Sequence, residues 1–244
     1  MIDAETIGFI GLGHMGSKMC ANMSRDGKKL LVYDNSITAV NNVCNNNDIN
    51  ATAAKSIEEI GEKCSVIFSM LPNDAAVKSV SNSLLKGSNS NNSNSKYLLH
   101  VSCSTISPVT SRGLSEEYNN NKNKDMTFIA SPVFARPDGI SKRQATWMIA
   151  GNNKKPIQGR DVTSELLESS GKCVDYGDDT GASNVVKLCG NFLIASTIES
   201  VSEAMALAEK HGVDRKEVMS MLTADGSIFD CLIYKGYGQR VSQR

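Results

Sequence analysis

Short apolar runs alternate with segments of helical period over the first 175 residues of the chain. Most runs are bounded by Gly, Asn, Pro or Ser, and most lack a strict alternation of apolar and polar positions. Continuous apolar strands separated by helices are typical of a parallel sheet that is covered on both faces. The pattern therefore predicts an α/β fold, a doubly wound parallel sheet of Rossmann type, with strands at residues 7–11, 30–34, 66–71, 97–101, 126–130, 146–151 and 173–177.

After Asp179 the pattern changes to one long helical period. We expect a helix from Thr180 to His211 that ends at Gly212, because glycine is the common residue just past a helix C-terminus. A second helix is expected over residues 214–222, with Asp214 as its N-cap.

The change of pattern indicates two domains that meet near Gly177. We predict a dinucleotide-binding Rossmann domain over residues 1–177 and an incomplete all-α domain over residues 178–244, built on the one long helix. Three Asn/Ser-rich tracts cannot bury apolar area and are expected to be solvated loops or frayed helix ends. They are residues 41–48, 86–96 and 119–124.

The charge balance favours a small-molecule partner. Lys plus Arg (26) equals Asp plus Glu (26), so nothing favours binding to nucleic acid or to an anionic membrane. The chain has seven cysteines without C-x-x-C spacing and only three histidines, so no metal site is expected. The scattered cysteines also predict reduced thiols and a cytoplasmic location. The first six residues are acidic and a strand pattern follows at once, so no presequence is expected. No apolar run approaches the roughly 18 residues of a membrane span.

A glycine-rich loop directly follows the first predicted strand and precedes a helix. Its glycines allow a tight turn and a close approach of a pyrophosphate to backbone amides at the helix N-terminus. The G-x-G-x-x-G spacing is weak by itself, but the strand before it and the helix after it make the prediction of a nicotinamide dinucleotide site strong. The predicted contacts are Gly11, Leu12, Gly13, His14, Met15 and Gly16.

Asp34 ends the second predicted strand, 18 residues beyond Gly16. A carboxylate there can accept hydrogen bonds from the adenosine ribose and repels a 2′-phosphate, so NAD is favoured over NADP. The adjacent Asn35 is included among the cofactor contacts. Alternatively, Asp34 forms a turn before a helix that starts near Ser36, and both roles can hold at once.

Lys187 lies in a helical segment that is apolar nearly all round, between Val185 and Ile194. Such a helix is expected to be buried, and a lysine within it must reach solvent, pair or take part in chemistry. A lysine whose pKa is lowered by burial can give a proton to the oxygen of a carbonyl that accepts hydride, and take it back in the reverse direction. Asn191 lies one turn further along the same face. The alternative is a lysine at a domain edge with a solvated ammonium.

Five segments, taken together and in this order, resemble the β-hydroxyacid dehydrogenase family, which includes 3-hydroxyisobutyrate dehydrogenase. They are GFIGLGHMG (8–16), SMLPNDAAV (69–77), VSCSTISP (101–108), SPVFARPDG (131–139) and GASNVVKLCGNF (181–192). The resemblance implies a Rossmann domain followed by a helical domain. It also implies NAD or NADP as cofactor, hydride transfer to or from a small 3-hydroxy acid or semialdehyde, and a homodimer formed through the helical domain.

The resemblance also implies roles for single residues. Leu71 and Pro72 would pack against the cofactor, and Thr105 would contact it. Ser104 would bind cofactor or substrate, although Ser104 and Thr105 are also common turn formers. Lys187 would transfer the proton, and Asn191 would assist it or bind a substrate carboxylate.

The sequence departs from the family pattern in three places. Phe134, Ala135 and Arg136 stand where the family has Ser-Gly-Gly for a substrate carboxylate, although Arg136 could pair with one. Ser183 replaces the second glycine of the G-x-G that begins at Gly181. The chain also stops at Arg244, within what looks like a further helix, so we expect a fragment or a short form with impaired activity. Two rival functions stay open: an imine reductase, and a protein that binds NAD(P) without turnover.

Overall fold

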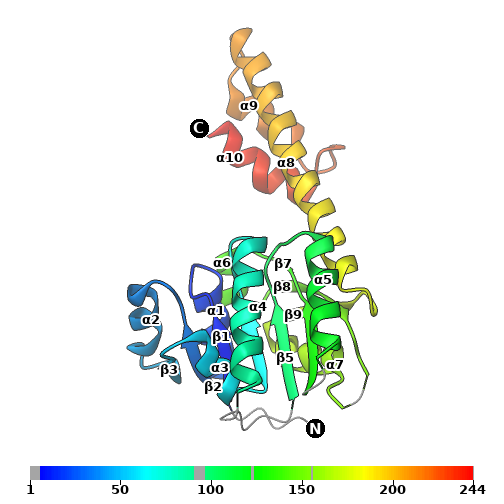
Figure 1. The fold of residues 1–244 in the computed structure, drawn as a ribbon. Helices are drawn as coiled ribbons and strands as arrows, with labels where there is room; N and C mark the ends of the chain where they lie inside the picture. Colours follow the sequence, from blue (N-terminus) through cyan, green and yellow to red (C-terminus); the bar gives the residue numbers. More distant parts are fainter. Residues whose placement is uncertain (1–5, 91–96, 122–123, 155, 244) are drawn as a thin grey trace. The chain divides into compact units, whose positions relative to one another are not determined.

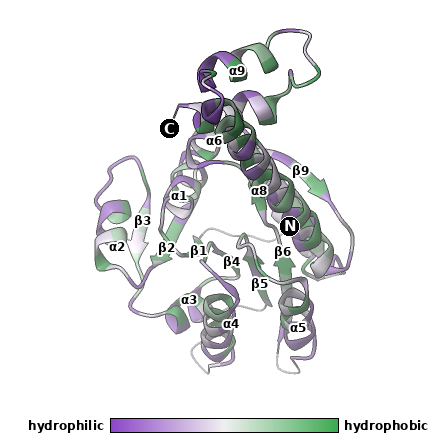
Figure 2. Cartoon of the chain, turned by 90° about the horizontal axis from the view of Figure 1, so that it is seen from above, coloured by the Kyte–Doolittle hydropathy of each residue, from purple (hydrophilic) through white to green (hydrophobic). Residues whose placement is uncertain are grey.

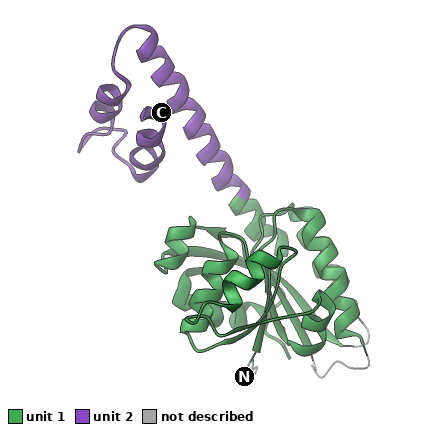
Figure 3. Ribbon diagram, turned by 90° about the vertical axis from the view of Figure 1, so that its left-hand side faces the viewer, with its two compact units in different colours: residues 1–187 green, residues 188–244 purple. Residues whose placement is uncertain are grey.

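The computed structural model describes residues 6–90, 97–121, 124–154 and 156–243. The chain divides into two compact units, residues 1–187 and residues 188–244 (Figure 3). In the first unit the elements are β1 (Thr6–Ile10), α1 (Gly16–Arg25), β2 (Lys29–Tyr33), α2 (Ile37–Cys44), β3 (Ala51–Ala53), α3 (Ile57–Lys63), β4 (Val66–Ser69), α4 (Asp74–Ser88), β5 (Tyr97–Ser102), α5 (Pro108–Asn119), β6 (Asp125–Ala130), β7 (Val133–Phe134), α6 (Pro137–Ser141), β8 (Ala145–Gly151), α7 (Gly159–Leu167), the 3₁₀ turn η1 (Glu168–Ser170) and β9 (Gly171–Asp175). Helix α8 (Thr180–Lys210) begins in the first unit and is followed by α9 (Arg215–Leu222), the π-helical turn η2 (Tyr234–Gly238) and α10 (Gln239–Ser242) (Figure 1).

The strands of the first unit form one mixed sheet in the order β3-β2-β1-β4-β5-β6-β8-β7, with β9 paired to β8. Strands β1 to β6 are parallel, as expected. The expectation of a wholly parallel sheet is wrong at one edge, because β8 runs antiparallel to β6 and β7. An apolar run carries no mark of its direction, so the sequence pattern could not distinguish the two cases.

The seven expected strands all occur, with small shifts at their ends, and two short strands were missed. Strand β3 has three residues and β7 has two, too few for a recognisable pattern. The first Asn-rich tract continues α2 up to Cys44, and Val43 within it is 2% exposed, so this part of the tract is neither a solvated loop nor a frayed helix end. Residues 91–96 and 122–123 of the other two tracts lie outside the described residues.

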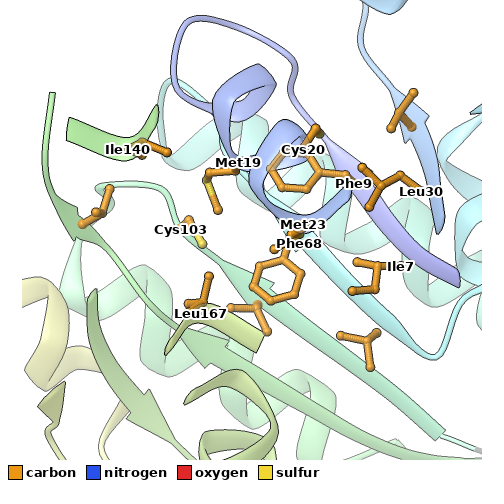
Figure 4. Close-up of a cluster of buried hydrophobic side chains, with 14 of the residues drawn as sticks. Ile7, Phe9, Met19, Cys20, Met23, Leu30, Phe68, Cys103, Ile140 and Leu167 are labelled. Atoms are coloured by element: carbon orange, nitrogen blue, oxygen red, sulfur yellow. The ribbon is translucent and has the colours of Figure 1, made fainter. Parts of the chain in front are cut away.

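Side chains of the sheet pack on both faces, which is why the strands are apolar without alternation. One face joins residues of α1, α2, α6 and α7, among them Met19, Cys20, Ile140 and Leu167 (Figure 4). The other face joins residues of α3, α4 and α5, such as Ile60 and Leu84. Along β2 and β4 consecutive residues alternate between the two clusters, and Figure 2 shows α3, α4 and α5 on the opposite side of the strands from α1.

The second unit has a small core of its own, in which Val201, Met205 and Met219 are at most 5% exposed. The long helix was predicted within a residue of its observed end, and Gly212 follows it at φ +74°. The predicted cap of α9 is confirmed, since the Asp214 carboxylate accepts hydrogen bonds from the amides of Lys216 and Glu217. By length and composition alone α8 could also cross a membrane, a criterion that the core helices of soluble proteins meet as well.

Candidate functional site

The glycine-rich loop lies at the carboxyl end of β1. At two of its glycines, neighbouring backbone atoms leave no room for a side chain. Gly11 has φ +95°, and a Cβ there would collide with the Met70 carbonyl oxygen. A Cβ on Gly16 would collide with the Gly11 carbonyl oxygen. At Gly13, by contrast, a Cβ would meet no atom within 4 Å. The open space in front of Gly13 is what a close approach of a pyrophosphate requires.

Asp34 ties this loop to the end of β2. One carboxylate oxygen accepts a hydrogen bond from the Leu12 amide at 2.7 Å, and the other accepts one from the Ser36 amide at 2.7 Å. The expected turn is therefore present, and Ser36 caps α2 through the Ala39 amide. Each carboxylate oxygen has a second lone pair, which leaves Asp34 able to accept hydrogen bonds from a ribose.

A cavity of about 560 Å³ lies at this end of the sheet. Strand order reverses between β1 and β4, and ligands of doubly wound sheets bind at such a switch point. The cavity brings together nine of the predicted cofactor residues: Gly11, Gly13, His14, Met15, Gly16, Asp34, Asn35, Leu71 and Pro72. Leu12 lines a second cavity, of about 480 Å³, on the other side of the loop. Size, lining and the open space at Gly13 fit a dinucleotide.

Two hydrogen-bonded links hold the loops after β4 and β5 together. The Ser104 hydroxyl accepts a hydrogen bond from the Leu71 amide at 2.8 Å, and Ser104 is 1% exposed. The Asp74 carboxylate accepts one from the Ser107 amide at 3.1 Å. Ser104 thus positions the Leu71–Pro72 turn and is not part of the cavity lining. Thr105 is half-buried and lies outside the cavity lining, so its cofactor contact stays a prediction.

The first turn of α8 is anchored to the Rossmann unit by buried polar side chains. The side-chain oxygen of Asn184 accepts a hydrogen bond from the backbone amide of Ile106 at 3.3 Å. The side-chain nitrogen of Asn184 donates one to the Ser111 hydroxyl at 2.7 Å. Ser183 donates to the Ala130 carbonyl oxygen at 3.1 Å, which explains how a serine fits where the family has glycine. Both are 0% exposed. The sequence analysis missed Asn184, and the only signal was a polar residue inside an apolar helical segment.

Outside this anchor a bidentate ion pair joins Arg112 of α5 to Asp179, with both N–O distances at 2.8 Å. Asp179 also accepts a hydrogen bond from the Gly181 amide. The guanidinium of Arg112 holds the pKa of the Asp179 carboxyl below its ordinary value. The ion pair fixes the chain at the point where α8 begins, ahead of Lys187 in the same helix.

Lys187 is half-buried, and burial lowers the pKa of its ammonium. Its Nζ lies 4.2 Å from the centroid of the Phe134 ring. Within the described part of the chain it has no hydrogen bond or ion pair. An unpaired lysine with a lowered pKa is suited to donate and accept a proton.

The expectation that the helix around Lys187 is buried is wrong. Val185, Leu188, Phe192 and Leu193 are 43%, 41%, 70% and 60% exposed. An apolar surface all round predicts burial only where other elements pack against it, and the described residues cover these side chains only in part. Asn191 lies four residues after Lys187 on α8 and is half-buried, and its role stays a prediction.

Among the described residues no group of three His, Cys, Asp or Glu side chains is placed to hold a metal ion. All seven cysteines are free thiols, and burial raises the pKa of Cys64 to about 12. The site therefore consists of the cofactor cavity and the half-buried lysine.

Two family models match the chain. Residues 6–177 match the NAD binding domain of 6-phosphogluconate dehydrogenase. Residues 181–239 match the NAD-binding domain of NADP-dependent 3-hydroxyisobutyrate dehydrogenase. Together the two matches extend over most of the chain, including α8.

Individual relatives agree with the models. A probable mitochondrial 3-hydroxyisobutyrate dehydrogenase of Dictyostelium discoideum is 30% identical over 227 residues, which are 92% of this chain and 66% of that protein. Among solved structures, a Mycobacterium tuberculosis 3-hydroxyisobutyrate dehydrogenase with L-serine has a TM-score of 0.78 at 23% identity, covering 96% of this chain and 75% of the other. A Streptomyces aurantiacus imine reductase has a TM-score of 0.70 at 19% identity, covering 85% and 68%. At these identities the two structures show the fold alone. The chain belongs to the β-hydroxyacid dehydrogenase family, and its cofactor is NAD or NADP.

Proposed function

We propose that this protein is an NAD(P)-dependent oxidoreductase that interconverts a small 3-hydroxy acid and the corresponding semialdehyde. The observation that carries the proposal is Lys187, an unpaired and half-buried lysine with a lowered pKa in the same compact unit as a dinucleotide-sized cavity. The names of the relatives support the reaction class. A cytoplasmic location and a homodimer through the helical domain remain expectations.

The cofactor would lie along the carboxyl ends of β1, β2 and β4. Amides of the Gly11–Gly16 loop would hold the pyrophosphate, and Leu71 and Pro72 would flank the nicotinamide half. Asp34 would accept hydrogen bonds from the ribose with the lone pairs that Leu12 and Ser36 leave free. Its negative charge disfavours a 2′-phosphate, so we expect NAD to be preferred.

Lys187 would act as the proton donor in reduction and the proton acceptor in oxidation. When bound, the reduced nicotinamide supplies hydride to the carbonyl carbon. The carbonyl π electrons then move to oxygen, which takes a proton from the Lys187 ammonium. In the reverse direction neutral Lys187 removes the proton of the hydroxyl, and the hydride of the carbon returns to the oxidised nicotinamide. Asn191 would orient the ammonium or bind a substrate carboxylate.

The experiment is substitution of Lys187 by methionine, which keeps the length of the side chain and removes the amine. We expect kcat for 3-hydroxyisobutyrate oxidation to fall by about 10² to 10⁴, the usual contribution of a general acid–base group. NADH binding, followed by nicotinamide fluorescence, should change less than twofold. Lys210→Met, at the other end of the same helix, is the matched control and should leave both quantities unchanged.

The pH profile gives a second test of the same residue. Oxidation requires neutral Lys187, and its pKa is lowered, so kcat/KM for oxidation should rise with pH and level off below the ordinary lysine value of 10.5. Reduction requires the charged form and should fall over the same range. A Lys187→Met variant with near wild-type turnover and an unchanged pH profile would exclude the role.

An imine reductase is the second candidate, and one observation favours it. The ring of Phe134 lies over Lys187, where the family pattern has a serine that helps to hold a carboxylate. A cyclic imine needs a proton donor but no carboxylate site. Reduction of 2-methyl-1-pyrroline with NADH or NADPH, compared with semialdehyde reduction by the same preparation, separates the two. Cofactor binding without turnover of either substrate would support the third alternative, a non-catalytic NAD(P)-binding protein.

A further inference from the structure

Phe134 occupies a position that the backbone fixes. It ends the two-residue strand β7, where Val133 pairs with Trp147 and Phe134 pairs with Thr146 of β8. Val133 is 5% exposed and belongs to the core cluster of one sheet face. Side chains of consecutive strand residues point to opposite faces, so burial of Val133 turns Phe134 away from that core. The Phe134 side chain is accordingly half-buried and free to contact α8.

The contact it makes is with the ammonium of Lys187. The distance of 4.2 Å from Nζ to the ring centroid is well inside the range of a cation–π interaction. The ring face carries the negative part of the aromatic quadrupole, which attracts the ammonium. Lys187 has no hydrogen bond or ion pair among the described residues. The Phe134 ring is therefore the group that restrains the ammonium end of the lysine side chain.

The same ring determines what can bind beside the lysine. A substrate oxygen that exchanges a proton with Lys187 must come within hydrogen-bonding distance of Nζ. The groups next to the reacting carbon then lie within reach of the Phe134 ring. A phenyl face gives no hydrogen bond to a carboxylate and repels its charge, whereas it packs well against an alkyl group.

We infer that Phe134 is a positioning and specificity-determining residue, which holds the Lys187 ammonium and selects substrates with an apolar substituent beside the reacting carbon. The inference rests on the proposed function and narrows its substrate class. Within the small 3-hydroxy acids it favours those that are alkylated at the neighbouring carbon, with the carboxylate directed away from the ring.

The test compares two alcohols that differ by one methyl group at that carbon, 3-hydroxypropanoate and 3-hydroxyisobutyrate. For the wild-type protein with NAD we expect kcat/KM to be at least about tenfold higher for 3-hydroxyisobutyrate, as one methyl group in an apolar pocket provides. Phe134→Ala, which removes the ring without introducing the serine of the family pattern, should reduce this ratio to about 1, and Phe134→Tyr should keep it. An unchanged ratio in Phe134→Ala would overturn the inference. NADH affinity serves as the check that each variant is folded.

A second readout needs no turnover. A methylene group over an aromatic ring has its proton resonance shifted upfield by the ring current, and lysine-labelled protein shows the Lys187 ε-methylene directly. The peak is assigned by its loss in Lys187→Arg. We expect an upfield peak in the wild type and in Phe134→Tyr, and a peak at the ordinary lysine position in Phe134→Leu. If the Lys187 ε-methylene resonance has the same position in the wild type and in Phe134→Leu, the Phe134 ring does not hold the lysine.

The two readouts distinguish failure of the inference from failure of the proposed function. If the wild type oxidises neither alcohol while the ring-current shift is present, the 3-hydroxy acid activity is wrong and Phe134 still positions Lys187. If it oxidises both alcohols at equal kcat/KM, the activity stands and the selection by Phe134 is wrong.

Discussion

Asp34 has a structural task and a proposed role in cofactor binding, and its hydrogen bonds make the two difficult to separate by substitution. Both of its carboxylate oxygens accept hydrogen bonds from backbone amides, from Leu12 in the glycine-rich loop and from Ser36 before α2. The side chain thereby fixes the loop on which a pyrophosphate would rest. Asp34 also lines the cavity, together with Asn35. An effect of substitution on cofactor binding therefore needs a control for the loop.

We predict that Asp34→Asn lowers the affinity for NADH by about tenfold or more, because hydrogen bonds to a charged acceptor are each worth about 1.5–3 kcal/mol. The affinity for NADPH should fall less, since removal of the negative charge also removes its repulsion of a 2′-phosphate. Fluorescence titration with both cofactors gives the ratio. Ser36→Ala weakens the cap of α2 by about 1 kcal/mol and should leave the ratio unchanged. Equal losses for NADH and NADPH in Asp34→Asn would limit Asp34 to its structural task.

At the level of elements, the two ends of α8 were predicted well, but the burial of its side chains was predicted poorly. Its apolar period gives both ends within a residue, because the period is a local property of the sequence. Whether an apolar face is covered depends on other elements, and the exposed Phe192 and Leu193 show that the period alone does not decide it. The anchoring role of Asn184 was missed for the same reason, since its partners are more than 70 residues away in sequence.

The sheet also has features that depend on tertiary contacts and could not be predicted from the local sequence. Five of the parallel strands, β1, β2, β4, β5 and β6, could be placed from their apolar runs and from the turns that bound them. The direction of β8 and the existence of β7 could not, because direction and pairing are set by tertiary contacts. The residues predicted for the cofactor half of the site lie on local loops after strands, and the structure brings most of them together in one cavity. The contact of Phe134 with Lys187 was not, although both residues had been singled out.

We predict that Asn184→Ala destabilises the Rossmann unit by about 2–3 kcal/mol. The substitution leaves the Ile106 amide and the Ser111 hydroxyl without their partner in a buried setting, and each such loss costs about 1–3 kcal/mol. Urea unfolding followed by circular dichroism measures the change. Asn191→Ala, the same substitution two turns along the helix at a half-buried position, should cost less than about 1 kcal/mol. Equal effects of the two substitutions would show that Asn184 is no anchor.

At the scale of the whole molecule, a buried polar cluster links acid stability to one histidine. His100 on β5 is 0% exposed, with Nε2 2.8 Å from the Ser69 hydroxyl and Nδ1 2.9 Å from the Tyr118 hydroxyl. Phe128 packs edge-on against the ring at a centroid distance of 5.2 Å. Its hydrogen-bond partners are hydroxyl groups, and burial lowers the pKa of His100 from 6.5 to about 3. The folded chain therefore holds a neutral imidazole throughout the range in which an unfolded chain takes up a proton there.

The free energy of unfolding should consequently fall as the pH falls from 6.5 toward 3, because only the unfolded state binds the extra proton in that window. The loss from His100 is roughly 1.4 kcal/mol per pH unit, or about 2.7 kcal/mol at pH 4.5. His100→Gln keeps a hydrogen-bonding side chain and removes the titration, so its stability curve should lack this part of the slope. Urea unfolding of wild type and variant at pH 7 and pH 4.5 measures the difference, with His211→Gln, an exposed histidine, as the control that retains the wild-type slope. Parallel curves for wild type and His100→Gln would mean that the acid sensitivity of the fold arises from its carboxylates and not from this histidine.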